Sequence, residues 1–392
     1  MIDTIGFVAI CLLISFFLSE LFHYFKYPRV LGYILAGIFL GLPVFSGFFS
    51  GEILSDIGFL SELGIIFLLM LTGMEINFRN VEKTEKDSTI IALFSIITSF
   101  AMGFLLIYIS GFSLLSAFVV GACFALTAEG TIVELLFENK VLNTKLGTII
   151  VSSGIIDDLF GVTFLSVILL IVTKNLPALA LFPFKLLIFI AIAYLAYRLL
   201  PAFLRFIHDE KSMTTTFSAL ILFALIIAAL SDNLSLGPII GAFLAGLIIQ
   251  ISMRNKRDRK DFKENKSVLE LMTLAFIVPF FFINIGLNFD IVSVIENWPL
   301  VIIITLVATI SKIVGSIIAT PFTSLNIKQT HLIGWGRNSR GGIELVIAEV
   351  ARLNGLISIE IYSAFVAMAV ITTFVFPIIL RSTIKGDRTI MY

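Results

Sequence analysis

The sequence predicts an all-α polytopic membrane protein with about 13 transmembrane helices. Of the 392 residues, 58% are hydrophobic and 14% are charged, a balance that soluble domains do not carry. Apolar runs long enough to cross a bilayer recur along the chain, and several of them carry charged residues near their middle. The first observation places the chain in a membrane, and the second indicates that some spans do more than anchor it.

Hydropathy, together with the positions of polar and glycine residues, divides the chain into thirteen candidate spans. A helix needs about 20 residues to cross the hydrocarbon core. The spans are placed near residues 3–22, 30–46, 56–74, 89–110, 113–137, 145–173, 178–203, 214–230, 236–251, 268–287, 297–320, 330–351 and 359–381.

Lys and Arg are unevenly distributed over the segments that join these spans. With the N-terminus outside, the inside segments hold 21 of them and the outside segments hold 3. Positive charge marks the cytoplasmic side, so we expect a multi-pass protein of the cell membrane with the N-terminus outside and the C-terminus in the cytoplasm. The basic cluster that begins at Arg254 is short and contains acids, which favours a topology anchor over a nucleic-acid site.

Two adjacent carboxylates, Asp157 and Asp158, lie near the middle of span 145–173. A charge at this depth costs about 2.5–3.5 kcal/mol on insertion scales, so a pair of acids indicates an ion or proton site. Neighbouring residues of a helix point about 100° apart, so the two acids face different partners. The alternative is that both acids only pair with basic residues and hold helices together.

Helical spacing assigns a different environment to each acid. Asp158 shares a stripe with Gly154 and Gly161, where missing side chains leave room for water or an ion, so we expect it to face a cavity. Asp157 stacks over Ser153 and is expected to face a protein partner.

The partner predicted for Asp157 is Lys312, at mid-depth in span 297–320. Ala308, Gly315 and Ser316 are small neighbours of this lysine on the helix, so we expect the helix that carries the acids to approach there closely. A lysine that extends to the membrane surface is the alternative.

Polar inserts interrupt two of the apolar runs, Thr127–Thr131 in span 113–137 and Gly336–Gly342 in span 330–351. Unwound backbone at membrane depth is tolerated where it lines a cavity or is covered by protein. We therefore expect two broken helices whose inserts line the site.

Charged residues of the inserts are expected to face the ends of half-helices. Glu129 would face positive ends, and Arg337 or Arg340 would face negative ends. For the second insert, a hairpin loop near the membrane surface is the alternative.

A related phrase occurs twice, as LGYILAGIFLGLP at Leu31 and LGPIIGAFLAGLII at Leu236, about seven spans apart. Each polar insert also lies in the middle span of a triplet, and seven spans separate the triplets. An odd offset reverses orientation, which predicts an inverted repeat.

At these residues the chain resembles the monovalent cation:proton antiporters, in particular the NapA-like branch that includes the potassium efflux systems. The resemblance covers nearly the whole chain and rests on the LGYILAGIFLG phrase, the GIIDD pair, the PFFFINIGLNFD phrase, the lysine of SKIVGS and the RGGIELVIA phrase. It implies that Asp158 binds cation and protons, that Asp157 pairs with Lys312 and helps to hold Na⁺, and that Thr127, Glu129, Thr131 and Ser153 line the site.

The resemblance also implies a NapA/NhaA-like fold with two crossed broken helices, usually as a homodimer. We expect a dimerisation domain in residues 1–88 and 214–296, a core domain in 89–173 and 297–392, and a linker helix in 174–213. In relatives the position of Glu129 is often a serine or threonine, so this site is expected to carry extra negative charge. The chain ends at Tyr392 without the soluble nucleotide-binding domain of the potassium efflux systems, so gating of that type is not expected.

The function expected from this resemblance is exchange of Na⁺ or Li⁺ for H⁺ by an elevator-like alternating-access movement that is electrogenic. A potassium/proton antiporter is the alternative within the family, and a cation channel or an ion sensor is the alternative from another class. We expect no enzymatic activity, no cofactor and no nucleic-acid partner. The two cysteines, Cys11 and Cys123, lie in apolar runs and lack the spacing of a metal site.

Overall fold

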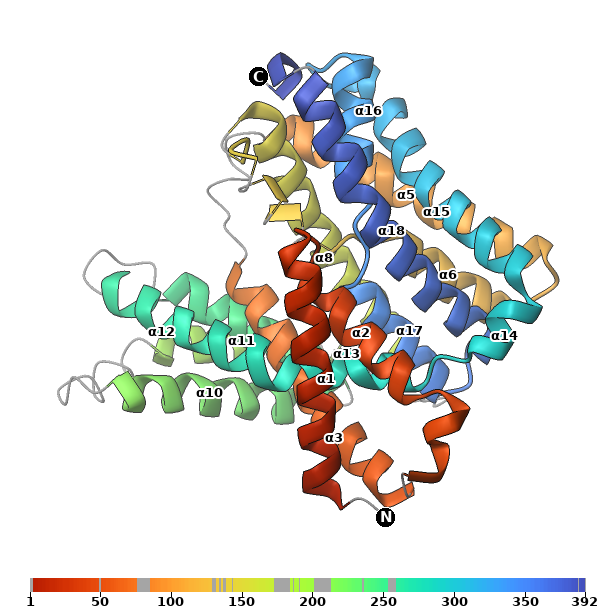
Figure 1. Cartoon of the computed structure of the whole chain (residues 1–392). Coiled ribbons are helices and arrows are strands. Elements are labelled where there is room, and N and C mark those ends of the chain that lie inside the picture. Colours follow the sequence, from red (N-terminus) through yellow and green to blue (C-terminus); the bar gives the residue numbers. More distant parts are fainter. Residues whose placement is uncertain are drawn as a thin grey trace. The chain divides into compact units, whose positions relative to one another are not determined.

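A computed structural model gives the structure of the chain. It describes residues 3–48, 51–75, 85–128, 132–133, 135–136, 139–142, 144–172, 184–185, 187–189, 191–200, 213–234, 236–252, 259–386 and 388–391. These residues form helices and connecting turns, with no strand among them (Figure 1). The prediction of an all-α protein is confirmed.

Eight helices in the described part of the chain are long and apolar enough to cross a membrane. The sixth joins α12 (Arg259–Met272), a π-helical turn η2 (Thr273–Ile277) and α13 (Val278–Leu287). The others are α1 (Thr4–Tyr24), α3 (Gly51–Glu75), α5 (Glu85–Ile109), α8 (Lys145–Val172), α10 (Met213–Asn233), α15 (Trp298–Ile318) and α18 (Ile359–Gly386). All eight coincide with predicted spans, while the total of thirteen and the inverted repeat stay predictions.

The described part also contains shorter helices, and both predicted interruptions lie at the ends of such helices. They are α2 (Arg29–Leu40), α6 (Leu114–Ala125), α11 (Pro238–Ser252), α14 (Ile291–Glu296), α16 (Ile327–Gly336), α17 (Ile343–Leu353) and the 3₁₀ turns η1 (Pro43–Phe48), η3 (Thr320–Phe322) and η4 (Arg388–Met391). Non-helical residues follow α6 at 126–128 and separate α16 from α17 at 337–342. Of the first insert, residues 129–131 lie outside the described part, as do several residues of the predicted span 178–203.

Local sequence signals fix the ends of the broken helices. Ser113 caps α6 by accepting from the backbone N–H of Ser116. Asn326 and Gln329 form a reciprocal capping box at the start of α16. Between α16 and α17, Gly341 has a φ of +124°, a conformation that residues with a side chain rarely adopt. Local sequence features therefore favour the second interruption.

The described residues belong to two compact units. Unit one comprises residues 1–12, 48–76 and 166–284, and unit two comprises residues 13–47, 77–165 and 285–392. The division into dimerisation, linker and core domains stays a prediction.

In unit one, α3 and α11 make their closest approach at a pair of glycines. A Cβ atom on Gly73 would lie 2.2 Å from the carbonyl oxygen of Phe243, and one on Gly246 would lie 1.9 Å from that of Met70. Backbones this close leave no room for a methyl group, so the two glycines set the distance between these helices.

Replacing Gly73 by alanine is therefore expected to destabilise the protein by about 1–3 kcal/mol, because the methyl group overlaps backbone that cannot rotate away. Thermal unfolding of the purified full-length protein in detergent measures the effect. Gly58→Ala is the matched control, since it lies on the same helix with nothing within 4 Å of its Cβ position. Equal melting temperatures for the two variants would contradict the close approach.

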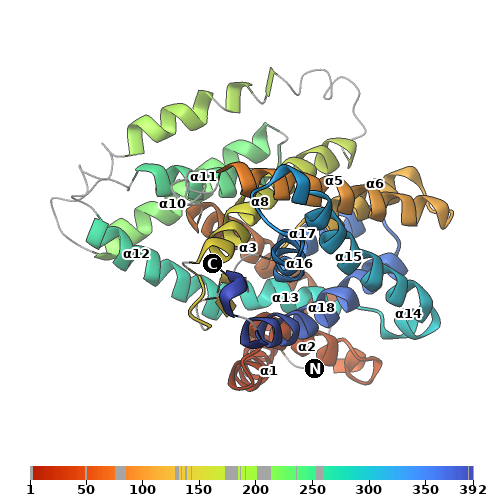
Figure 2. The same cartoon turned by 90° about the horizontal axis from the view of Figure 1, so that it is seen from above.

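In unit two, α5 packs against α6 and α15, and α17 packs against α6 and α18. Figure 2 shows α5 and α15 side by side. The small face of α15 is occupied by α5, because a Cβ atom on Gly315 would lie 2.7 Å from the Cα of Ser95. The approach of the acid-bearing helix near the small residues of α15 stays a prediction, while the space beside Gly315 itself is filled by α5.

Candidate functional site

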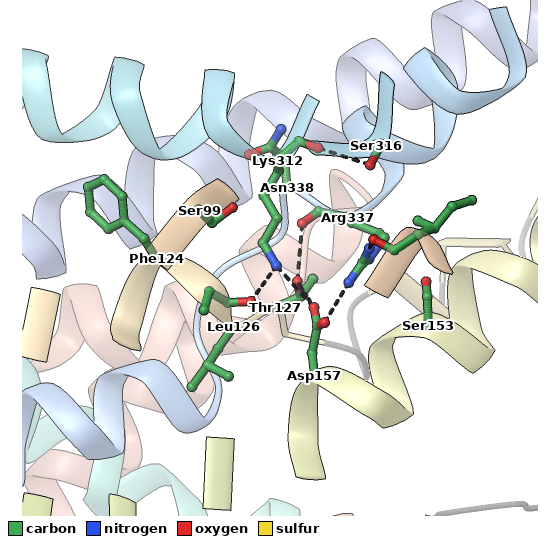
Figure 3. Close-up of polar contacts among 12 residues, drawn as sticks. Ser99, Phe124, Leu126, Thr127, Ser153, Asp157, Lys312, Ser316, Arg337 and Asn338 are labelled. Atoms are coloured by element: carbon green, nitrogen blue, oxygen red, sulfur yellow. Dashed lines mark hydrogen bonds and ion pairs between the residues drawn. The ribbon is translucent and has the colours of Figure 1, made fainter. Parts of the chain in front are cut away.

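The two interruptions cross within unit two. The backbone N–H of Ala128, just after α6, donates to the carbonyl oxygen of Ser339, between α16 and α17 (3.0 Å). The hydroxyl of Thr127 also contacts the carbonyl oxygen of Arg337 (3.3 Å; Figure 3). Extended backbone at the crossing thus finds partners in the other broken helix, which satisfies the requirement for buried polar groups.

Two cationic side chains contact the carboxylate of Asp157, on α8, at this crossing. Its Oδ2 accepts from Nζ of Lys312 (3.0 Å) and from the hydroxyl of Thr127 (2.8 Å), and its Oδ1 accepts from Nη2 of Arg337 (2.5 Å). Figure 3 shows Lys312 and Arg337 reaching the carboxylate from two sides. All three charged side chains are fully buried. Asp157 therefore joins α8, α15 and both broken helices in one network.

Positive charges also lie against the C-terminal end of the half-helix α6. Nζ of Lys312 donates to the carbonyl oxygen of Ala125 (2.5 Å). Nη1 of Arg340 donates to the carbonyl oxygens of Cys123 and Phe124 (both 3.1 Å) and to that of Leu126. The last carbonyls of a helix carry partial negative charge and have no partner inside the helix, so these two cations satisfy them.

Asp158 follows Asp157 on α8 and is buried, with 6% of its surface exposed. The glycine stripe predicted beside it is partly filled, because a Cβ atom on Gly161 would lie 3.1 Å from the side chain of Leu126 and 3.2 Å from that of Ile343. The prediction of open room at Gly161 is wrong, because larger apolar side chains from neighbouring elements pack into the space.

The remaining predicted site residues have different outcomes. Ser153 is buried one turn before Asp157, and its hydroxyl donates to the carbonyl oxygen of Ile150 in its own helix (2.9 Å). Glu129 and Thr131 lie outside the described residues. Arg337 and Arg340 are fully buried, so the alternative of a surface hairpin for the second insert is wrong.

Two polar residues at the crossing were not predicted as site residues from the sequence. Glu344, in the first turn of α17, is fully buried, and its Oε1 accepts from the backbone N–H of Gly341. The amide of Asn338 donates to the carbonyl oxygens of Thr309 (3.2 Å) and Gly334 (3.3 Å). The available signal was Glu344 itself, since an acid inside an apolar run one turn after an insert resembles the pattern that singled out Asp157.

Apolar membrane-crossing helices, two interrupted helices that cross at depth and a buried network of charges at the crossing together define the class of ion-coupled secondary transporters. The chain belongs to the sodium/hydrogen exchanger family, whose transmembrane model matches residues 8–386. It is a monovalent cation:proton antiporter, a multi-pass membrane protein and a transporter rather than an enzyme.

Similarity to characterised proteins extends over nearly the whole chain. It is 28% identical to a Na⁺/H⁺ antiporter of Enterococcus hirae over 97% of both chains. It is 26% identical to the Na⁺/H⁺-K⁺ antiporter GerN of Bacillus cereus, over 96% of this chain and 95% of that one. Its fold is similar to that of the sodium proton antiporter MjNhaP1 from Methanocaldococcus jannaschii, with a TM-score of 0.73, 14% identity and coverage of 98% of this chain and 97% of that one.

Proposed function

We propose that the protein exchanges Na⁺ or Li⁺ for H⁺ across the cell membrane by elevator-like alternating access, with Asp158 as the group that carries both ions. The observation that carries this proposal is the pairing of Asp157 with two cations, beside a buried Asp158 on the same helix. Asp157 is thereby engaged in the network, and we assign the exchange of ligands to Asp158, the adjacent buried acid on the same helix.

Competition at Asp158 supplies the coupling. A cation needs the deprotonated carboxylate, and protonation removes the charge that attracts it. One carboxyl group therefore holds either a cation or a proton, so loading one releases the other. When the site opens to the two sides of the membrane in turn, this competition becomes exchange.

Asp157 was also predicted as a ligand of Na⁺, and its contacts set a condition for that role. Its Oδ1 faces Arg337 and its Oδ2 faces Lys312 and Thr127. It reaches a cation when one of these donors moves away, and Lys312 is the displaceable one, since Arg337 then still neutralises the carboxylate. Arg337 thus keeps Asp157 in place while Lys312 changes partner.

A displaceable lysine together with two acids permits two protons to be exchanged for one Na⁺, which makes the exchange electrogenic. Membrane voltage then acts on the net charge moved, at about 2.3 kcal/mol per charge per 100 mV. The uneven distribution of Lys and Arg supports an outside N-terminus and a cytoplasmic C-terminus. A homodimer in which the core domain moves against the dimerisation domain completes the proposal.

Potassium is the second candidate ion, and one observation favours it: the name of the relative GerN couples K⁺ as well as Na⁺ to H⁺. Carboxylate and hydroxyl oxygens at Asp158 and Thr127 suit Na⁺, Li⁺ and K⁺ alike, so the choice depends on the size of the site. A channel or a sensor would use the same ligands without exchanging protons for them.

Reconstitution of the purified protein in vesicles that contain a pH-sensitive dye tests the function. Na⁺ or Li⁺ added to one side of the vesicle membrane is expected to drive H⁺ across the membrane in the opposite direction. A clamped membrane potential is expected to change the rate of exchange because net charge moves. A response to K⁺ alone would establish the second candidate. Cation flux without proton counterflow would identify a channel, and ion binding without flux would identify a sensor, so either result would overturn the proposal.

A further inference from the structure

Among the described residues of unit two, three carboxyl groups besides that of Asp158 are fully or almost fully buried, and they differ in what neutralises them. Asp157 has a cation on each oxygen. Glu349 on α17 accepts hydrogen bonds from both Nε (3.0 Å) and Nη2 (2.7 Å) of Arg352. Glu344 on the same helix accepts a single backbone N–H, that of Gly341, at Oε1. Within the described part of the chain its Oε2 has no hydrogen-bond partner, and Glu344 forms no ion pair.

Glu344 lies at the crossing of the broken helices. A Cβ atom on Gly342 would be 3.5 Å both from Oε2 of Glu344 and from the Cα of Ala128, the residue whose N–H donates to Ser339. Gly342 has no side chain to cover Oε2, so this oxygen points at the junction of the two inserts. Other polar atoms of the second insert also have no partner among the described residues, namely Nε of Arg337, Oδ1 of Asn338, Oγ of Ser339 and Nε of Arg340.

Glu344 lies in the first turn of α17, where the positive end of the helix attracts negative charge. Within the described part of the chain its carboxyl group is fully buried and forms no ion pair, an environment in which an isolated charge is unfavourable. Arg340 donates to the carbonyl oxygens at the end of α6, and among the described residues no hydrogen bond or ion pair joins its guanidinium to Glu344.

Polar groups on the elements around Glu344 have partners other than its carboxyl group. On α6, the thiol of Cys123 donates to the backbone oxygen of Glu344 (3.4 Å), so it does not occupy the carboxyl group. On α18, the hydroxyl of Thr373 donates to the carbonyl oxygen of Arg340 (2.5 Å). The cations of the Asp157 network, Lys312 and Arg337, are paired with that acid.

We propose that Glu344 is a second proton-binding carboxyl group of the transport core, which takes up and releases a proton at Oε2. The step is a simple protonation: a hydronium ion in the water of the open pathway gives up a proton and becomes water, an O–H bond forms at Oε2, and the carboxyl group changes its charge from −1 to 0. This role rests on the antiport proposed above, because alternating access supplies the water that reaches the crossing. Glu344 adds to Asp158 a group whose charge depends on pH.

Infrared difference spectroscopy of the full-length protein between alkaline and acidic pH tests this directly. We expect the carbonyl band of a protonated carboxylic acid to appear on acidification, and about one acid per chain to be missing from this band in Glu344→Gln. Labelling with ¹³C-glutamate is expected to shift this component in the wild type. Glu349→Gln is the matched control on the same helix, and it should retain the component because both oxygens of Glu349 already accept hydrogen bonds from Arg352. An unchanged band in Glu344→Gln would overturn the proposal.

Gly342→Ala provides a second variant if Glu344→Gln does not fold. The added methyl group fits at ordinary contact distance from Oε2 and excludes water from it without changing any charge. After a jump in pH the glutamate component is expected to appear more slowly, since the methyl group hinders water from reaching Oε2. An unchanged rate would show that the component does not come from Glu344.

Transport and proton binding separate this proposal from the proposed function. In Asp158→Asn the glutamate component is expected to persist although exchange is lost. In Glu344→Gln exchange is expected to continue with a pH dependence that is less steep by about one proton, because one titrating group is removed. Loss of exchange in Asp158→Asn with an unaltered Glu344 signal supports both statements. Exchange retained in Asp158→Asn would remove the proposed function while the glutamate signal still decides the role of Glu344.

Discussion

Asp158→Asn is expected to abolish cation/proton exchange, with a loss of about 100-fold or more, the size typical of removing a positioned proton-transfer group. Asparagine keeps the shape of the side chain, but it does not take up a proton as a carboxylate does and lacks the negative charge that attracts a cation. Because Asp158→Asn leaves the ion pairs of Asp157 with Lys312 and Arg337 in place, the folded state should survive. Dye-based exchange in vesicles measures the loss, and thermal unfolding in detergent measures the stability.

The control for this variant is an aspartate that lies outside the site. Asp56 on α3 is exposed and accepts from the hydroxyl of Thr4 (2.9 Å), so Asp56→Asn should exchange ions at the wild-type rate. If Asp158→Asn also exchanged ions at that rate, the central assignment would be wrong, and another acid would have to carry the ions.

Asp157→Asn is expected to lower the free energy of unfolding by about 3–5 kcal/mol, the usual effect of removing one partner of a buried ion pair. The substitution leaves two buried cations, Lys312 and Arg337, without a counter-charge. The neutral amide still accepts a hydrogen bond, but it no longer offsets the desolvation of the cations. Thermal unfolding of the full-length protein in detergent, followed by loss of helical circular dichroism, measures the effect.

Lys312→Met is the informative comparison for Asp157→Asn. It removes one cation and leaves Asp157 paired with Arg337, so the loss of stability should be clearly smaller. Glu349→Gln is the second comparison, since its partner Arg352 has 20% of its side chain exposed and can turn to water. A loss in Asp157→Asn no larger than in Lys312→Met would show that Arg337 does not share the carboxylate.

Much of the fold could be predicted because membrane insertion imposes a simple rule on the sequence. The polar inserts at Thr127 and Gly336 disrupt apolar runs, and the structure interrupts α6 and separates α16 from α17 at these points. Lys312 was named as the partner of Asp157 because a charge at mid-depth needs one, and the two lie 3.0 Å apart.

Contacts between distant elements were harder to predict. Small residues around Lys312 indicated a close neighbour but not its identity, which proved to be α5 beside Gly315. Gly161 indicated space but not that Leu126 and Ile343 pack against it. The position of Arg337 against Asp157 depends on the path of an irregular segment, and helical periodicity says nothing about such a path.

The sequence by itself determined the membrane class, the placement of the long spans, the two interruptions and the short set of charged residues at depth. These follow from the cost of placing polar groups in hydrocarbon, which each segment bears independently of the others. Only the tertiary structure decided that two cations share Asp157, that Arg340 holds the end of α6 and that Glu344 lies at the crossing without an ion pair among the described residues. Pairing between segments far apart in the chain depends on how the helices pack around the crossing, and no local pattern records that packing.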